Sequence, residues 1–140
     1  MIVLDTNVIS AVMQQPPDKR VVEWIDQQPQ NSIWTTSITV LEIRFGLGIL
    51  PSSKRQRTLI EAFEAALEAM NQRVLAFDTE GAEQAGELMA ARQKAGRRGD
   101  LRDTMIAGIV LAHRATLATR NIFHFKDLSV PVINPWQPKS

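Results

Sequence analysis

The sequence contains no cysteine, and this single absence excludes several kinds of site. A chain without cysteine has no disulfide framework, no thiolate nucleophile and no zinc centre with cysteine ligands. Tyrosine is also absent, and aromatic residues make up only 6% of the chain. We therefore do not expect an RNA-recognition motif that stacks bases on exposed aromatic rings, and we expect the three tryptophans in the core or at an interface.

Long apolar runs are missing as well. No segment approaches the roughly 20 consecutive apolar residues of a membrane span. The short apolar run at 2–4 lacks the basic region that precedes a signal peptide's apolar core. We therefore expect a cytoplasmic protein with no membrane partner. The formal net charge of +1 neither requires nor excludes a nucleic-acid partner.

The pattern of apolar residues predicts one α/β domain over residues 1–140. Short apolar segments alternate with longer segments in which apolar residues recur at helical spacing. Strands are expected at 2–4, 33–35, 74–77, 116–119 and near 132–133, and helices at 18–28, from 36 or 37 to 46, from 52 or 53 to 70, at 79–95 and through 105–112. This alternation indicates a short central parallel sheet with helices on both faces.

Three acidic residues lie among apolar neighbours near the ends of these elements. Asp5 directly follows the first predicted strand, Glu42 falls within an apolar helix, and Asp103 opens the helix through 105–112. Asp5 alone could simply be a helix N-cap. An ionised carboxylate on an apolar face, however, needs a partner charge or a metal. If the three acids converge, they need a divalent cation between them, and their oxygen ligands favour Mg²⁺ or Mn²⁺.

The residues around Asp103 allow more than one interpretation. Asp100, three positions earlier, is either an N-cap of the same helix or a further acid of the site. Arg97, Arg98 and Arg102 lead directly to Asp103. They are candidates for contacts with RNA phosphates, although such a basic run is often only a solvated face.

The two histidines do not complete a serine–histidine–acid triad. His113 follows the apolar helix, where a basic residue interacts favourably with the helix dipole. His124 is expected on the surface, with a phosphate contact as the alternative.

At these residues the sequence resembles the PIN-domain nucleases, particularly the VapC-type toxins of bacterial toxin–antitoxin pairs in their FitB-like group. The resemblance covers nearly the whole chain and rests on segments in matching order, MIVLDTN (1–7), SITVLEIRFG (37–46), DTMIAG (103–108), TRNIFHF (119–125) and NPW (134–136). Each motif is weak alone, but together they are specific. The resemblance implies an α/β fold and a Mg²⁺- or Mn²⁺-dependent endoribonuclease that cleaves RNA with a metal-activated water.

The same resemblance implies partners. It predicts an inhibitory antitoxin related to VapB or FitA, which would place a basic side chain in the acidic site and carry the toxin onto operator DNA. It also predicts a homodimer. The apolar stripe of the helix over 53–70 is the face from which we expect the dimer to form.

By motif, the resemblance assigns the acids of the site to Asp5, Glu42 and Asp103. Many family members have a fourth acid where this chain has Asn121. Asparagine can supply a neutral carbonyl ligand but no charge. The resemblance therefore leaves open whether the site holds a second metal firmly.

Three further residues of the matching segments are candidates for supporting roles. Thr6 and Ser37 carry hydroxyl groups that could order the site, and either could instead cap a helix. Arg120, next to Asn121, joins the candidate RNA contacts.

Other functions fit parts of the pattern. A non-catalytic dimeric module could bind an antitoxin and, through it, operator DNA, but such a module would not need the three acids. A structure-specific DNA nuclease shares the acid cluster, although such nucleases are usually longer. A phosphatase of the haloacid-dehalogenase type would need an aspartate where this chain has Asn7.

Overall fold

Five parallel strands form the centre of the computed structural model, which describes residues 1–137. In chain order they are β1 (Ile2–Leu4), β2 (Ile33–Thr36), β3 (Val74–Leu75), β4 (Thr116–Ala118) and β5 (Val132–Ile133). Across the sheet the order is β3-β2-β1-β4-β5, and every neighbouring pair is parallel. The strand order therefore reverses between β1 and β4. Open parallel sheets bind ligands at the carboxyl ends of the strands at such a switch point.

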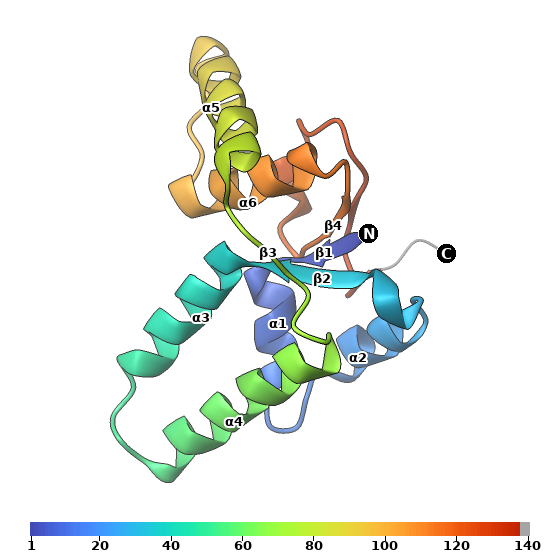
Figure 1. The fold of residues 1–140 in the computed structure, drawn as a ribbon, viewed down its shortest axis with the longest axis vertical. Helices are drawn as coiled ribbons and strands as arrows, with labels where there is room; N and C mark the ends of the chain where they lie inside the picture. Colours follow the sequence, from blue (N-terminus) through green and yellow to red (C-terminus); the bar gives the residue numbers. More distant parts are fainter. Residues whose placement is uncertain (138–140) are drawn as a thin grey trace.

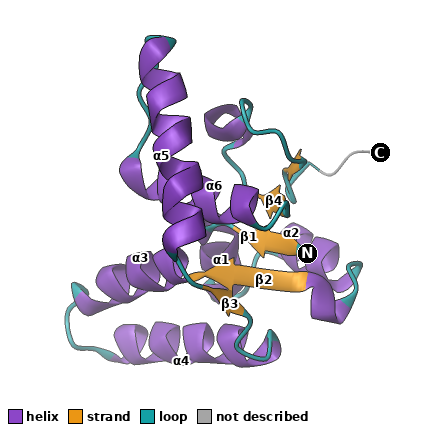
Figure 2. Ribbon diagram, turned by 45° about the horizontal axis from the view of Figure 1, so that its top comes forward, coloured by secondary structure: helices purple, strands orange, loops and turns teal. Residues whose placement is uncertain are grey.

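Helices cover both faces of this sheet, so the α/β fold predicted from the sequence is confirmed (Figures 1 and 2). They are α1 (Thr6–Met13), α2 (Lys19–Asp26), α3 (Ser37–Gly48), α4 (Lys54–Ala69), α5 (Thr79–Lys94) and α6 (Leu101–Ala112), with short 3-10 turns η1 (Gln30–Ser32) and η2 (Ile122–Phe125). Figure 1 shows α1 to α4 on one side of the sheet and α5 with α6 on the other. None of the helices within residues 1–137 has the length and apolarity needed to cross a bilayer.

Alternate strand residues contribute to two hydrophobic cores. Leu4 packs into the core beneath α1 to α4, whereas its neighbour Val3 packs into the core beneath α6. Successive side chains of a strand point to opposite faces, and a parallel sheet covered on both faces needs apolar residues on each. Phe63 of α4 and Phe125 of η2 are fully buried, one in each core.

Short polar residues determine where the helices begin. The N-caps of α2 to α6 each accept a backbone N–H of the first turn and are, in order, Asp18, Thr36, Ser53, Asp78 and Asp100. The strand predicted over 74–77 is shorter than expected and ends at Leu75. The sequence pattern did not predict the two 3-10 turns.

The apolar stripe of α4, the face from which the sequence predicts a dimer, packs largely into the protein's own core. Phe63 and Leu67 of α4 are buried in the same core as the side chains of α1. An exposed apolar stripe lies on α3 instead, where Leu41, Phe45 and Ile49 are 54%, 61% and 68% exposed. Helical periodicity alone does not distinguish a stripe that closes the protein's own core from one that faces a partner.

The helices α5 and α6 pack very closely at Gly108. A Cβ atom added there would collide with the backbone carbonyl of Gly81 and with Ala85. Only glycine allows the two helices to approach this closely, which explains a glycine within the apolar segment of α6. The contact holds α6 against α5 and so helps to position Asp103 in its first turn.

A buried arginine anchors η2 beside α6. Arg92 of α5 is 6% exposed, and its Nε and Nη2 donate to the two carboxylate oxygens of Asp127 at 2.8 and 2.9 Å. Its Nη1 donates to Thr104 Oγ1 at 3.2 Å, and Nη2 also donates to the carbonyl of His124 at 3.1 Å. The hydrogen bonds from Arg92 hold the pKa of Asp127 below its ordinary value. One guanidinium therefore links α5, α6 and η2.

We predict that Asp127→Asn destabilises the protein at neutral pH by about 3 kcal/mol, because Arg92 keeps its buried charge and loses the opposite one. The folded-state pKa of Asp127 is lowered from 3.8. Its contribution is therefore fully present above that value and is lost as the pH falls through the lower folded-state pKa. Urea unfolding at neutral pH and at about pH 3 should show a difference between variant and wild type that shrinks in acid.

Glu83→Gln is the matched control, since Glu83 is an exposed acid on α5. Its free energy of unfolding should stay within about 0.5 kcal/mol of the wild-type value. An Asp127→Asn effect of the same size at both pH values would contradict the ion-pair explanation.

Candidate active site

Asp5 lies at the switch point of the sheet, directly after β1. Its Oδ1 accepts a hydrogen bond from the backbone N–H of Thr6 at 2.8 Å, which makes Asp5 the N-cap of α1. Its Oδ2 accepts a hydrogen bond from Thr119 Oγ1 at 2.7 Å, and its backbone N–H donates to the carbonyl of Ala118 at 2.9 Å. The residue is 3% exposed. Asp5 is thus a cap and, in addition, a buried carboxylate between β1 and β4.

The environment of Asp5 opposes its ionisation. The pKa of Asp5 is raised to about 6. Burial is the largest cause, the negative charges of Asp103 and Glu42 also raise the pKa, and hydrogen bonds from Thr119 and Thr6 oppose the rise. The three acids predicted from the sequence therefore share one electrostatic environment. A buried carboxyl group whose pKa is raised by neighbouring acids is typical of a functional site.

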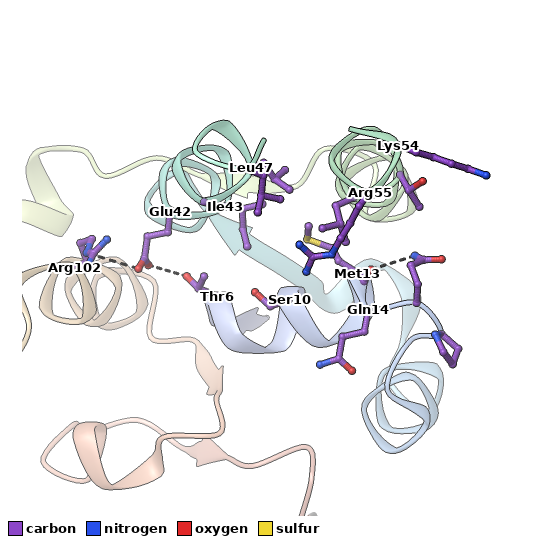
Figure 3. A pocket seen from close by; sticks show the side chains of 16 residues that line it. Thr6, Ser10, Met13, Gln14, Glu42, Ile43, Leu47, Lys54, Arg55 and Arg102 are labelled. Carbon is purple, nitrogen blue, oxygen red and sulfur yellow. Dashed lines mark hydrogen bonds and ion pairs between the residues drawn. The ribbon is translucent and has the colours of Figure 1, made fainter. Parts of the chain in front are cut away.

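Glu42 extends from α3 toward α1 and α6 (Figure 3). Its Oε1 accepts a hydrogen bond from Thr6 Oγ1 at 2.8 Å, and Thr6 Oγ1 shares a further hydrogen bond with Thr39 Oγ1 at 3.0 Å. Its Oε2 lies 3.7 Å from Nε of Arg102. The structure therefore brings Thr6 and Arg102 to the acid, and the charge of Arg102 faces Glu42.

Asp103 occupies the first turn of α6 and lies 3.4 Å, Oδ2 to Nδ1, from His124. Burial and the nearby charge of Asp100 raise the pKa of Asp103, while the hydrogen bond and charge of His124 and the charge of Arg102 lower it. Asp100 accepts the backbone N–H groups of Arg102 and Asp103 at 2.9 and 3.1 Å. The interpretation of Asp100 as an N-cap is therefore confirmed. His124 is exposed, as expected, and it also contacts Asp103.

The segment after β4 closes the site through contacts that the sequence pattern did not reveal. Asn7 Nδ2 donates to Asp5 Oδ2 and Thr119 Oγ1, each at 3.4 Å, and Asn7 Oδ1 accepts the backbone N–H of Arg120 at 3.2 Å. Thr119 Oγ1 accepts the backbone N–H of Asn121 at 3.0 Å. Asn7 and Thr119 belong to the motif segments at 1–7 and 119–125. Thr119 also follows the predicted strand at 116–119 at its carboxyl end, where open parallel sheets bind ligands, so the sequence held a second signal for it.

The hydroxyl of Ser37, a candidate for ordering the site, contacts a different part of the chain. Its Oγ accepts the backbone N–H of Phe77 at 3.0 Å, which secures the connection between β3 and α5. Thr39 is the residue whose hydroxyl reaches Thr6. Because Thr39 and Glu42 are three positions apart on α3, they share a helix face that Ser37 does not share with Glu42.

The other candidate RNA-binding arginines differ in their surroundings. Arg97 Nη1 lies 3.3 Å from Asp127 Oδ2. The guanidinium of Arg120 lies 4.7 Å from the ring centroid of Trp136. Arg98 is exposed and forms no ion pair with any residue in the range 1–137. Arg98 is therefore the arginine of this group whose charge has no partner in the described part of the chain.

A groove of about 1120 Å³ opens beside Thr6 and Glu42 (Figure 3). It extends between α1, α3 and the start of α4, where Lys54 and Arg55 line it. Apolar side chains line its middle and include Met13, Ile43, Leu47, Leu50 and Leu59. The groove thus joins the acidic site to a basic end across an apolar surface.

The oxygen donors of the site fit a divalent cation. Within residues 1–137, no three acidic, histidine or cysteine side chains form a group that could hold a metal by themselves. Mg²⁺ usually keeps several waters and binds through one or two carboxylates. Asp5, Glu42 and Asp103 therefore suit such an ion without direct ligation by all three, and a cation would relieve their repulsion.

The PIN domain family model matches residues 2–128. VapC ribonuclease Y4jK of Sinorhizobium fredii is 39% identical over 99% of this chain and 99% of its own length. Toxin FitB of Neisseria gonorrhoeae is 34% identical over 97% of this chain and 99% of its own length. The solved structure of FitAB bound to an IR36 DNA fragment covers all of this chain and 99% of the matched chain, with a TM-score of 0.90 at 33% identity. The chain belongs to the PIN-domain family, in its group of VapC- and FitB-type toxin ribonucleases.

Proposed function

We propose that this toxin ribonuclease is an endonuclease that cleaves RNA phosphodiester bonds with Mg²⁺ or Mn²⁺ bound at the cluster of Asp5, Glu42 and Asp103, in part through water molecules. The observation that carries the proposal is the buried carboxylate of Asp5, whose pKa is raised to about 6 by burial and by the two other acids. The family is typically metal-dependent, and the relative from Sinorhizobium fredii is named a ribonuclease.

The protein's own side chains position the acids. Thr119 and the N–H of Thr6 hold the two oxygens of Asp5, and the hydroxyl of Thr6 orients Glu42. When bound, the ion supplies the Lewis acidity that activates water and stabilises charge on the scissile phosphate. In this proposal the side-chain carbonyl of Asn121, whose backbone N–H donates to Thr119 Oγ1, is a neutral metal ligand that adds no charge.

The partner of this protein is a VapB- or FitA-like antitoxin, and the FitAB complex on DNA supports this proposal. The groove beside Glu42 suits a segment with an apolar face, because apolar side chains line its middle. A basic side chain of that segment would pair with Glu42, as Arg102 of this chain does. The antitoxin would also bring the toxin to operator DNA.

The toxin forms a homodimer through α3 in this proposal. Leu41, Phe45 and Ile49 follow one another at helical spacing and are each more than half exposed. A symmetric dimer needs one self-complementary patch on each copy, and an exposed apolar stripe provides it.

We predict that Asp5→Asn, Glu42→Gln and Asp103→Asn each lower RNA cleavage at least about a hundredfold, because charge stabilisation by a held metal is worth several kcal/mol. Asp100→Ala is the matched control, since Asp100 caps α6. It should keep cleavage and lose about 1 kcal/mol of stability. Cleavage of a mixed single-stranded RNA pool is measured with Mg²⁺, Mn²⁺ or EDTA, and circular dichroism verifies that each variant folds.

The ligand assignment is wrong if Asp100 proves essential while Asp103 is dispensable. The same assay on single-stranded and duplex DNA tests the other nuclease class. Cleavage of DNA in preference to RNA would replace the proposed substrate. If the wild-type protein cuts no nucleic acid but binds the antitoxin and operator DNA fully, the result would favour the non-catalytic module.

We predict that Asn121→Asp lowers the Mg²⁺ concentration for half-maximal cleavage, because added negative charge strengthens the binding of hard cations. In EDTA the same variant should melt at a lower temperature than wild type, since a fourth acid adds repulsion. Calorimetric titration with Mn²⁺ and thermal melts test both expectations. Asn31→Asp is the control, because Asn31 is exposed and precedes β2 at the opposite end of the sheet. If neither metal affinity nor melting changes in Asn121→Asp, Asn121 has no role at the metal site.

A further inference from the structure

A second, smaller cavity lies beside Asp103, between the α5–α6 connection and η2. Its volume is about 200 Å³, and Arg97, Arg98, Asp103, Phe123 and His124 are among the residues that line it. Pockets for drug-sized ligands usually measure about 300–1,000 Å³. This cavity is therefore the size of a small group, and it opens onto one of the acids of the proposed site.

Phe123 is the most exposed of the large apolar residues in the described chain, at 71%. The low aromatic content of the sequence did not indicate an exposed ring at this place. The position of Phe123 is nevertheless well defined. Two residues later Phe125 is fully buried, and the carbonyl of the adjacent His124 accepts a hydrogen bond from buried Arg92. Lys126 Nζ lies 4.1 Å from the centroid of the Phe123 ring. An aromatic ring is thus held in solvent on an anchored turn, with a cation on one side of it.

The charges around the cavity are mixed, because Asp100 and Asp103 line it together with the arginines, but one of its cations has no counter-charge. Arg98 forms no ion pair within residues 1–137, and Arg97 shares Asp127 with Arg92. An apolar protein segment would leave the charge of Arg98 without a counter-charge, whereas a phosphate would supply one. Arginine beside an exposed aromatic ring is the combination with which proteins bind single-stranded nucleic acids, because bases stack on the ring and phosphates meet the cation.

We propose that the exposed ring of Phe123 and the adjoining cavity together bind the nucleotide next to the scissile phosphate of single-stranded RNA, with its base stacked on the ring and its phosphate in the cavity at Arg98. The inference rests on the proposed ribonuclease function and adds two residues, Phe123 and Arg98, that bind its substrate. Stacking on Phe123 requires an unpaired base, since the bases of a duplex are already stacked on one another. Phe123 is a binding residue in this proposal, and the acids remain the residues that act on the scissile bond.

The test measures how tightly the full chain binds two RNA oligonucleotides of equal length, by fluorescence anisotropy in EDTA. One oligonucleotide has normal bases and the other has abasic nucleotides. Wild type should bind the normal oligonucleotide about tenfold more tightly than the abasic one, within the range expected for loss of base–aromatic stacking. Phe123→Ala should bind the normal oligonucleotide about tenfold more weakly and lose this preference. Phe123→Trp should keep it, and its fluorescence should be quenched by the normal oligonucleotide.

Two further variants separate the roles. Ile122→Ala, in the same turn, should leave the binding of both oligonucleotides unchanged. Arg98→Ala should weaken the binding of both equally and reduce the slope of log affinity against log salt by about 1. With Mg²⁺, Phe123→Ala should raise KM for cleavage about as much as it raises the dissociation constant, because it removes binding without touching the acids.

If Phe123→Ala binds the normal oligonucleotide as tightly as wild type does, the proposed subsite is wrong, even if wild type cleaves RNA. Equal loss of affinity for both oligonucleotides also overturns it, since a stacking contact depends on the base. If Phe123→Ala weakens only dimerisation or antitoxin binding, the ring is a protein contact and the proposal is wrong. If wild type cleaves no RNA in Mg²⁺ or Mn²⁺ and binds none, the proposed function fails and this inference fails with it.

Discussion

The carboxylate of Asp5 is held inside the protein at the switch point of the sheet, and the rest of the site depends on how it is held. Burial raises its pKa to about 6, so its negative charge at neutral pH is maintained at a cost in stability. The hydrogen bonds from Thr119 Oγ1 and the N–H of Thr6 offset part of this cost. These donors come from the end of β4 and the start of α1. The site therefore exists only where the sheet has brought β1 and β4 together.

The other two acids each have a counterpart that reduces their repulsion. Glu42 lies near Arg102, and Asp103 lies near His124. Both counterparts are about half exposed, and solvent weakens ion pairs at such positions. These two contacts can therefore be exchanged at small cost for a bound cation. In the proposed function that cation is a metal ion during cleavage and a basic side chain of the antitoxin during inhibition. One acid cluster thus serves both states.

A buried ion pair connects the stability of the fold with the rim of the site. Arg92 and Asp127 join α5 to the segment that follows η2, and Phe125 is buried beneath it. This anchoring determines where His124 and Phe123 lie. Arg92 lies a few positions before the basic residues Arg97, Arg98 and Arg102, yet it serves the fold, whereas Arg98, six positions later, is exposed. A basic run is therefore not a single functional unit.

Local signals in the sequence determined the fold class and most element boundaries. Apolar periodicity and short polar caps such as Asp100 act over a few neighbouring residues, so they can be interpreted without the fold. The motif segments also indicated the three acids. The tertiary structure alone decided the partners of each acid: Thr119 reaches Asp5 across 114 positions of the chain. It also decided that Phe123 is exposed while Phe125 is buried. Burial and hydrogen-bond partners depend on which distant segments pack together, and residue type and local spacing carry no information about that.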